Sequence, residues 1–358
     1  MRAALVIYGS IDSRSGGYLY DRMLVNEIES RGHDANIISL PLRRYPLGAL
    51  DNLSSRTLEE MTGASPDVLL EDELCHPSLF MLNRRFRERS PAPIISIVHH
   101  LACSAERSAR RRALSRALEK RYLGSVDAFV LNSNDSKEAV SGLLGKNITG
   151  VVACPGRDRA EIEGRAKDLR SGKLRLLYVG NILPHKGLDV LVRAVAMLKD
   201  EDVSLDVVGA PADRSFFRKV ERTVRKEGLG DRIAFHGYVP RPALDEMLED
   251  GHVLVAPSFH EGYGITCVEA CCHGVPVIAS DVGGLKETVP PEVGYRVPPG
   301  DPAALAGRIS FLDHNRATLE ALSSTAREHA ASLPSWEDSM GRAVDFIEEQ
   351  ASRGRAPL

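Results

Sequence analysis

Short apolar runs alternate with amphipathic stretches along most of the chain. In the first half the amphipathic stretches include one from about Leu19 to Ser30 and a long charged one that ends at Arg121. This alternation is typical of crossover units, in which helices connect the parallel strands of one sheet. The predicted strands of this half are AALVIYG, DANIISL, PIISIVHH, VDAFVLNS and ITGVVACPG.

The alternation begins again after a polar stretch, GRDRAEIEGRAKDLRSG, which we interpret as a linker with a surface helix. The chain is therefore predicted to be an α/β protein with two doubly wound domains, 1–160 and 161–334, that face each other across a cleft. Its last segment, 335–358, is expected to form a helix that packs across the domain junction. The second set of predicted strands is KLRLLYVG, VSLDVVG, RIAFHGYV, HVLVAP and VPVIAS.

Composition narrows the class of protein. The 358 residues carry a formal net charge of -3, whereas nucleic-acid-binding domains are usually basic, so we expect no nucleic-acid partner. The opening MRAALVIYG is too short for a signal sequence, and no apolar run reaches the roughly 18 residues of a membrane-spanning helix. The six cysteines show no metal-binding or disulfide spacing, which favours buried thiols and a cytoplasmic location.

The stretch SFHEGYGITCVEACCHG places two glutamates, Glu261 and Glu269, on either side of a glycine-rich turn. The turn follows a predicted strand and precedes a predicted helix. Glycines there allow close backbone approach to a ligand, and a helix start favours phosphate. A carboxylate accepts hydrogen bonds from adjacent hydroxyls, such as those of a ribose. The alternative is that both glutamates are ordinary surface residues.

Three further loops follow predicted strands. In LLYVGNILPHKGL, Lys186 stands just before a helix start, where a lysine is unfavourable unless an anion binds there. The first loop contains the pair Gly16 and Gly17, without the spacing of a dinucleotide fingerprint. The run PIISIVHH ends in His99 and His100, which are expected to point toward the cleft. Each feature alone also fits a plain surface loop or a buried histidine.

Together, these features and the downstream GVPVIASDVGGLKETV resemble the retaining GT-B glycosyltransferases with an E-x7-E motif, known as family 4 or glycosyl transferases group 1. The resemblance covers nearly the whole chain and is strongest from about Leu174 to Val289. It implies two Rossmann-like domains: the first recognises the acceptor, and the second binds a UDP- or GDP-linked sugar. No metal and no cofactor is implied beyond this nucleotide-sugar substrate.

The resemblance also implies roles for residues of this sequence. Glu261 lies near the donor sugar, Glu269 binds the ribose hydroxyls, and Lys186 neutralises the diphosphate leaving group. A histidine, His100 in preference to His99, lies beside the reacting carbon. The implied backbone contacts to the sugar and phosphates come from Gly16, Gly17, Gly262, Tyr263, Gly264 and Ile265.

The sequence departs from the family at Asn181, where a second cation, an arginine, is usual. Fewer cations should weaken stabilisation of the departing diphosphate. Asn181 can still donate hydrogen bonds, and His185 or Arg157 is a candidate substitute. The implied mechanism passes through an oxocarbenium-like centre, with the acceptor hydroxyl attacking the face from which the diphosphate leaves.

The acceptor is not specified by the sequence. The segment Arg107–Arg121 is rich in arginine and could bind anionic lipid, so the protein is expected to contact the inner membrane face as a peripheral protein. A lipid-linked glycolipid or polysaccharide precursor is then a candidate acceptor. A solvated charged helix is the alternative. Rival functions are a sugar phosphorylase, a nucleotide-sugar epimerase, and a non-catalytic nucleotide-sugar-binding protein in which Asn181 marks lost activity.

Overall fold

The computed structural model describes residues 1–43, 47–63, 65–105, 108–158 and 169–354. The described chain forms two compact units, Met1–Gly156 with Pro334–Leu358, and Arg157–Leu333. Each unit contains one six-stranded sheet in which every pairing is parallel. The predicted pair of doubly wound α/β units is confirmed. Most of the predicted linker lies outside the described residues.

The first unit has the strand order β2-β1-β3-β4-β5-β6. The order reverses direction between β1 and β3, so the carboxyl ends of these two neighbours form the switch point of this sheet. Its strands are β1 (Arg2–Tyr8), β2 (Asp34–Leu40), β3 (Val68–Asp72), β4 (Ile94–Val98), β5 (Ala128–Leu131) and β6 (Gly150–Val152). Its helices are α1 (Gly16–Ser30), η1 (Leu47–Leu53), α2 (Ser55–Gly63), η2 (Glu73–Cys75), α3 (His76–Leu79), α4 (Leu82–Arg87), α5 (Ala102–Ala105), α6 (Ala109–Leu123), α7 (Asn134–Leu144) and α15 (Trp336–Arg353).

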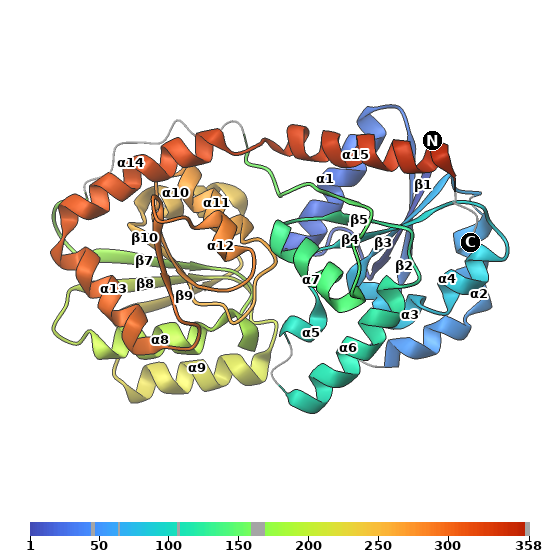
Figure 1. The fold of residues 1–358 in the computed structure, drawn as a ribbon. Helices are drawn as coiled ribbons and strands as arrows, with labels where there is room; N and C mark the ends of the chain where they lie inside the picture. Colours follow the sequence, from blue (N-terminus) through green and yellow to red (C-terminus); the bar gives the residue numbers. More distant parts are fainter. Residues whose placement is uncertain (44–46, 64, 106–107, 159–168, 355–358) are drawn as a thin grey trace. The chain divides into compact units, whose positions relative to one another are not determined.

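The second unit has the order β12-β11-β10-β7-β8-β9, with its switch point between β7 and β10. In Figure 1, α8 and α9 lie below these strands and α10 and α11 above them. The strands are β7 (Leu174–Val179), β8 (Val203–Val208), β9 (Ile233–Gly237), β10 (Val253–Ala256), β11 (Val277–Ser280) and β12 (Gly294–Val297). The helices are η4 (Pro184–Lys186), α8 (Leu188–Met197), α9 (Arg214–Lys226), α10 (Arg241–Asp250), α11 (Ile265–Cys272), α12 (Leu285–Thr288), α13 (Pro302–His314) and α14 (Arg316–Ser332).

The last helix, α15, packs in the first unit along α1 (Figure 1). It starts with a capping box, in which Ser335 and Asp338 satisfy each other's backbone amides. Trp336 packs edge-on against Tyr20 of α1, and Arg31, the C-cap residue of α1, forms an ion pair with Asp345 at 2.5 Å. The chain thus returns to its first unit, while packing across a domain junction stays a prediction. No helix among the described residues is long and apolar enough to cross a bilayer.

Candidate functional site

Two loops meet at the switch point of the second unit. The loop after β7 contains Lys186, and the loop after β10 contains Glu261, 75 positions further along the chain. Because β7 and β10 are paired neighbours, their carboxyl ends bring the two loops together. Nζ of Lys186 lies 2.6 Å from Oε2 of Glu261, which also accepts a hydrogen bond from the Ser258 hydroxyl at 3.2 Å. Lys186 and Glu261, both predicted as site residues from the sequence, therefore form an ion pair with each other.

Backbone contacts hold the two loops in register. The amide of Phe259 donates to the carbonyl of His185 at 2.7 Å. Gly187 adopts a φ of +69°, and a Cβ at this position would lie 2.0 Å from the carbonyl oxygen of Pro257. Only glycine satisfies both the left-handed backbone and this close approach. Gly187 before α8 is thus required by packing, independently of any anion.

Charge in this pair is set by its surroundings. Burial alone would raise the pKa of Glu261, but the adjacent ammonium of Lys186 lowers that pKa below its usual value. The side chains of Lys186 and Glu261 are 27% and 19% exposed, so both remain within reach of a ligand. Glu261 is therefore ionised at neutral pH and lies as an anion beside the Lys186 side chain.

A second glycine pair supports the turn that follows Glu261. A Cβ at Gly283 would lie 2.1 Å from the carbonyl oxygen of Glu261, and one at Gly284 would lie 2.2 Å from that of Gly262. The amide of Gly284 donates to the Glu261 carbonyl at 3.0 Å. The segment DVGG, part of the stretch that carries the resemblance, thus packs directly against the backbone of the turn.

The turn ends at α11. Gly264 is its N-cap with a φ of 96°, and it provides no side-chain cap for the first amides of the helix, which begins at Ile265. The carbonyl of Tyr263 is held by the hydroxyl of Thr288 at 3.0 Å. A helix start without a side-chain cap leaves backbone N–H groups for water or an anion. The start of α11 therefore has no side-chain cap, and its contact with phosphate stays a prediction.

The second motif glutamate, Glu269, lies on α11 and has a partner that the sequence did not reveal. Nη1 of Arg241, the first residue of α10, lies 2.5 Å from Oε1 of Glu269, and Nε of Arg241 lies 2.8 Å from Asp245. Burial raises the pKa of Glu269, and the Arg241 guanidinium opposes that rise. Nothing near PRPALDE singles out Arg241, because its partner is 28 positions away.

Neither proposed substitute for the missing family arginine is placed to act as one. Burial and the neighbouring Lys186 lower the pKa of His185 to about 4, so its ring is neutral at pH 7. The guanidinium of Arg157 donates to the carbonyls of Leu333 and Ala331 at 3.0 and 3.3 Å, at the end of α14. Asn181 follows β7 in the same loop as Lys186. Lys186 is therefore the cation of this loop.

The first unit places its glycine loop and one histidine together. Gly16 and Gly17 begin α1, whose N-cap Ser15 accepts a hydrogen bond from the amide of Tyr18. A Cβ at Gly17 would lie 3.2 Å from the ring of His99, so the lack of a side chain lets the ring approach. His99 follows β4, next to β3 in the sheet.

His99 has a buried acidic partner. Its Nε2 lies 3.0 Å from Oδ1 of Asp21 on α1, and the carboxyl of Asp72 at the end of β3 belongs to the same buried group. Burial would lower the pKa of His99, but Asp21 and Asp72 raise it to about 9. The contact with Gly17 favours His99, whereas the sequence-based preference was for the half-buried His100; the role of either stays a prediction.

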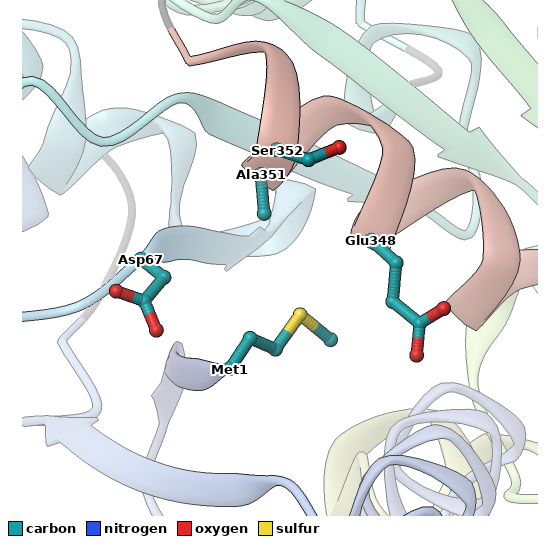
Figure 2. Close-up of a pocket in the computed structure, with 5 residues that line it drawn as sticks. All are labelled: Met1, Asp67, Glu348, Ala351 and Ser352. Carbon is teal, nitrogen blue, oxygen red and sulfur yellow. The ribbon is translucent and has the colours of Figure 1, made fainter.

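A pocket of the first unit lies elsewhere, where the start of β1 meets the end of α15 (Figure 2). Two of its carboxylates have partners, because Asp67 binds Arg2 and Glu348 lies 2.6 Å from His33. None of the predicted site residues lines it, and we assign it no role. Its lining residues are Met1, Asp67, Glu348, Ala351 and Ser352.

Comparison with known proteins agrees with this geometry. Residues 160–329 match the model of the family described as glycosyl transferases group 1. The D-inositol 3-phosphate glycosyltransferase of Thermomonospora curvata is 28% identical over 287 residues, and that of Geodermatophilus obscurus is 31% identical over 283. These alignments cover 72% and 73% of this chain but 66% and 61% of the relatives, so the chain spans less than two thirds of either relative's length.

Solved structures show the same fold over the whole chain. Sucrose-phosphate synthase from Thermosynechococcus elongatus superimposes with a TM-score of 0.84 at 22% identity, covering 99% of this chain and 100% of that one. HepE of Anabaena in complex with UDP and glucose gives a TM-score of 0.77 at 17% identity, covering 98% and 100%. Residues 160–329 are thus similar to the glycosyl transferases group 1 family, and the chain has the GT-B fold of two doubly wound units.

Proposed function

We propose that the protein is a retaining glycosyltransferase that moves a sugar from a UDP-linked donor to an acceptor hydroxyl. The observation that carries this proposal is the Lys186–Glu261 ion pair beside the glycine turn of α11, at the switch point of the second unit. Open parallel sheets bind ligands at this point. The relatives are glycosyltransferases by name, and HepE was solved with UDP-glucose, which supports uridine as the first base to test.

The donor's diphosphate fits the start of α11. The amides of the Gly262–Ile265 turn and the positive end of the helix dipole favour the phosphates. The ammonium of Lys186 stabilises the negative charge that develops as the sugar leaves, because a preorganised cation needs little rearrangement during the reaction. Asn181 adds a neutral donor in this loop, in place of a second cation.

The two motif glutamates hold different ends of the donor. Glu261, ionised beside Lys186, accepts hydrogen bonds from the sugar hydroxyls, and Glu269 accepts them from the ribose. Neither carboxylate is assigned as a covalent nucleophile. In the first unit, Oδ1 of Asp21 lies 3.0 Å from Nε2 of His99 and helps to keep this ring positively charged. The acceptor hydroxyl attacks the sugar on the face that the diphosphate leaves.

Ligand-dependent unfolding tests the donor assignment. UDP at about 100 times its dissociation constant should stabilise the folded protein by roughly 2.7 kcal/mol, since only the folded state has the site. GDP and ADP should shift the melting temperature less. The measurement is calorimetric unfolding of the full chain with each nucleotide. No shift with any of the three would contradict the proposal and favour a non-catalytic protein or another ligand.

Product analysis with the same protein distinguishes the rival enzyme activities. A transferase releases UDP from a UDP-sugar as an acceptor is added, whereas a phosphorylase releases a sugar phosphate only when inorganic phosphate is present. An epimerase changes the sugar while it stays linked to UDP. Product analysis of the bound and released sugar distinguishes these outcomes, and phosphate-dependent release would overturn the transferase assignment.

We further propose that α6 meets an anionic lipid surface, which would bring the enzyme to a lipid-linked acceptor. Its one acidic residue, Glu119, is buried, so the exposed charge on this helix is entirely basic. Arg107 of the predicted patch lies outside the described residues. A cytoplasmic location, with this contact at the inner membrane face, stays a prediction. The exposed basic residues are Arg110, Arg111, Arg112, Arg116, Lys120 and Arg121.

Vesicle binding tests this surface. A triple variant of α6, with Arg110, Arg111 and Arg116 changed to glutamine, should bind phosphatidylglycerol vesicles about 100-fold more weakly, at about 1 kcal/mol for each charge removed. The matched control changes Arg214, Arg218 and Arg222, which are exposed on α9 of the second unit. Sedimentation with neutral phosphatidylcholine vesicles gives the baseline. Equal losses in both triple variants, or equal binding to both vesicles, would contradict the proposal.

A further inference from the structure

Two buried glutamates of the first unit lie close together, and Nδ1 of His76 lies 3.2 Å from Oε1 of one of them, Glu73. Glu73 begins η2 and Glu119 lies on α6, and both are 0% exposed. One carboxylate oxygen of Glu73 lies within 4.8 Å of one of Glu119. Ionised carboxylates are acceptors only, so two of them cannot bond directly. A proton or a cation between the two carboxyl groups would remove their repulsion.

A third donor completes the group. His76, the first residue of α3, is 1% exposed, and one donor atom from each of the three residues lies within 4.8 Å of the other two. Both carboxylate oxygens of Glu73 are buried and make no hydrogen bond among the described residues. An uncompensated buried carboxylate is costly, since burial strongly disfavours its charged form. A cation bound by Glu73 would balance the charge of these two buried oxygens.

The hydrogen bonds that His76 and Glu119 make to the backbone are of the kind that hold metal ligands in place. Nδ1 of His76 bonds to the backbone carbonyl of Glu73 at 3.1 Å, and the amide of Cys103 donates to both oxygens of Glu119 at 3.2 and 3.1 Å. Such second contacts fix the ring and the carboxylate of ligating residues. A proton shared by two carboxyls would require neither the histidine nor its orientation.

We propose that Glu73, His76 and Glu119 form a buried zinc site. One imidazole and two carboxylates are a ligand set that Zn²⁺ accepts, and its double charge would balance the two acids. The ion would join η2 and α3 to α6, which lie side by side (Figure 1). The site would be structural, and it is separate from the Lys186–Glu261 pair of the second unit.

Metal analysis of the full chain tests the site. Protein expressed with added Zn²⁺ and dialysed should retain about one zinc per chain by mass spectrometry, the count that a single site predicts. A strong chelator should lower the melting temperature, and Zn²⁺ alone should restore it. Glu73→Gln should weaken zinc binding by about 10-fold or more and abolish the response to Zn²⁺.

Two further variants make the result decisive. Glu119→Gln should weaken zinc binding as Glu73→Gln does. It replaces Glu73→Gln in the test if that variant does not fold. His314→Gln is the matched control, because it removes a member of the partly exposed Glu201–Asp313–His314 group and should leave zinc content unchanged. The proposal is overturned if the parent protein holds no zinc, ignores the chelator, and is no more stable than Glu73→Gln. That result would assign the cluster to a shared proton, since burial raises the pKa of Glu73 to about 8.

Discussion

Lys186→Met is expected to lower the rate of sugar transfer by about 10²–10³-fold, the usual cost of losing one preorganised group that stabilises transition-state charge. The variant removes the cation of the loop after β7, which lies 2.6 Å from Glu261 and is proposed to stabilise the departing diphosphate. Since neither His185 nor Arg157 can replace it, we expect no residual charge compensation in this loop. Steady-state transfer with saturating UDP-sugar is the measurement.

The variant also leaves Glu261 without its ion-pair partner, which is expected to lower stability by on the order of 1 kcal/mol for this partly exposed pair. A double variant, Lys186→Met with Glu261→Gln, removes the unpaired charge and should recover the melting temperature without recovering transfer. Lys199→Met, an exposed lysine of the same unit, is the control. Recovery of transfer in the double variant would show that Lys186 acts only through folding.

Glu269→Ala is expected to weaken UDP binding by about 10- to 150-fold, the equivalent of one hydrogen bond to a charged group at about 1.5–3 kcal/mol. The reason is the loss of the carboxylate that is proposed to accept the ribose hydroxyls. Isothermal titration with UDP measures this effect. An unchanged dissociation constant would remove Glu269 from the nucleotide site.

Arg241→Met tests the electrostatic side of the same site. Burial raises the pKa of Glu269 and Arg241 opposes it, so removing Arg241 should raise that pKa further. The carboxyl would then be protonated at mildly acidic pH, and UDP affinity should rise with pH more steeply than in the parent. Asp245→Asn, which removes another ion-pair partner of Arg241 and keeps the guanidinium, is the control. Parallel pH profiles for Arg241→Met and the parent would count against this role.

Much of the fold was readable from the sequence because the apolar runs of parallel sheets are short, buried and separated by helices. The prediction missed β3, the strand VLLED, although it is central in the first sheet. It is only five residues long and ends in Glu71 and Asp72, which read as surface residues in a linear pattern. Both are buried, because β3 ends at the switch point where polar groups gather.

The sequence by itself determined that the chain has two doubly wound halves and that Lys186, Glu261 and Glu269 follow strand ends in the second half. Local spacing carries this information, since a strand, a glycine turn and a helix start are neighbours along the chain. It did not determine which side chains meet. The pairs Arg241–Glu269 and Asp21–His99 join residues 28 and 78 positions apart, and Glu73 meets Glu119 only because α3 packs on α6. Only the tertiary structure decided these contacts, because the charge and protonation of a buried group depend on its neighbours in space.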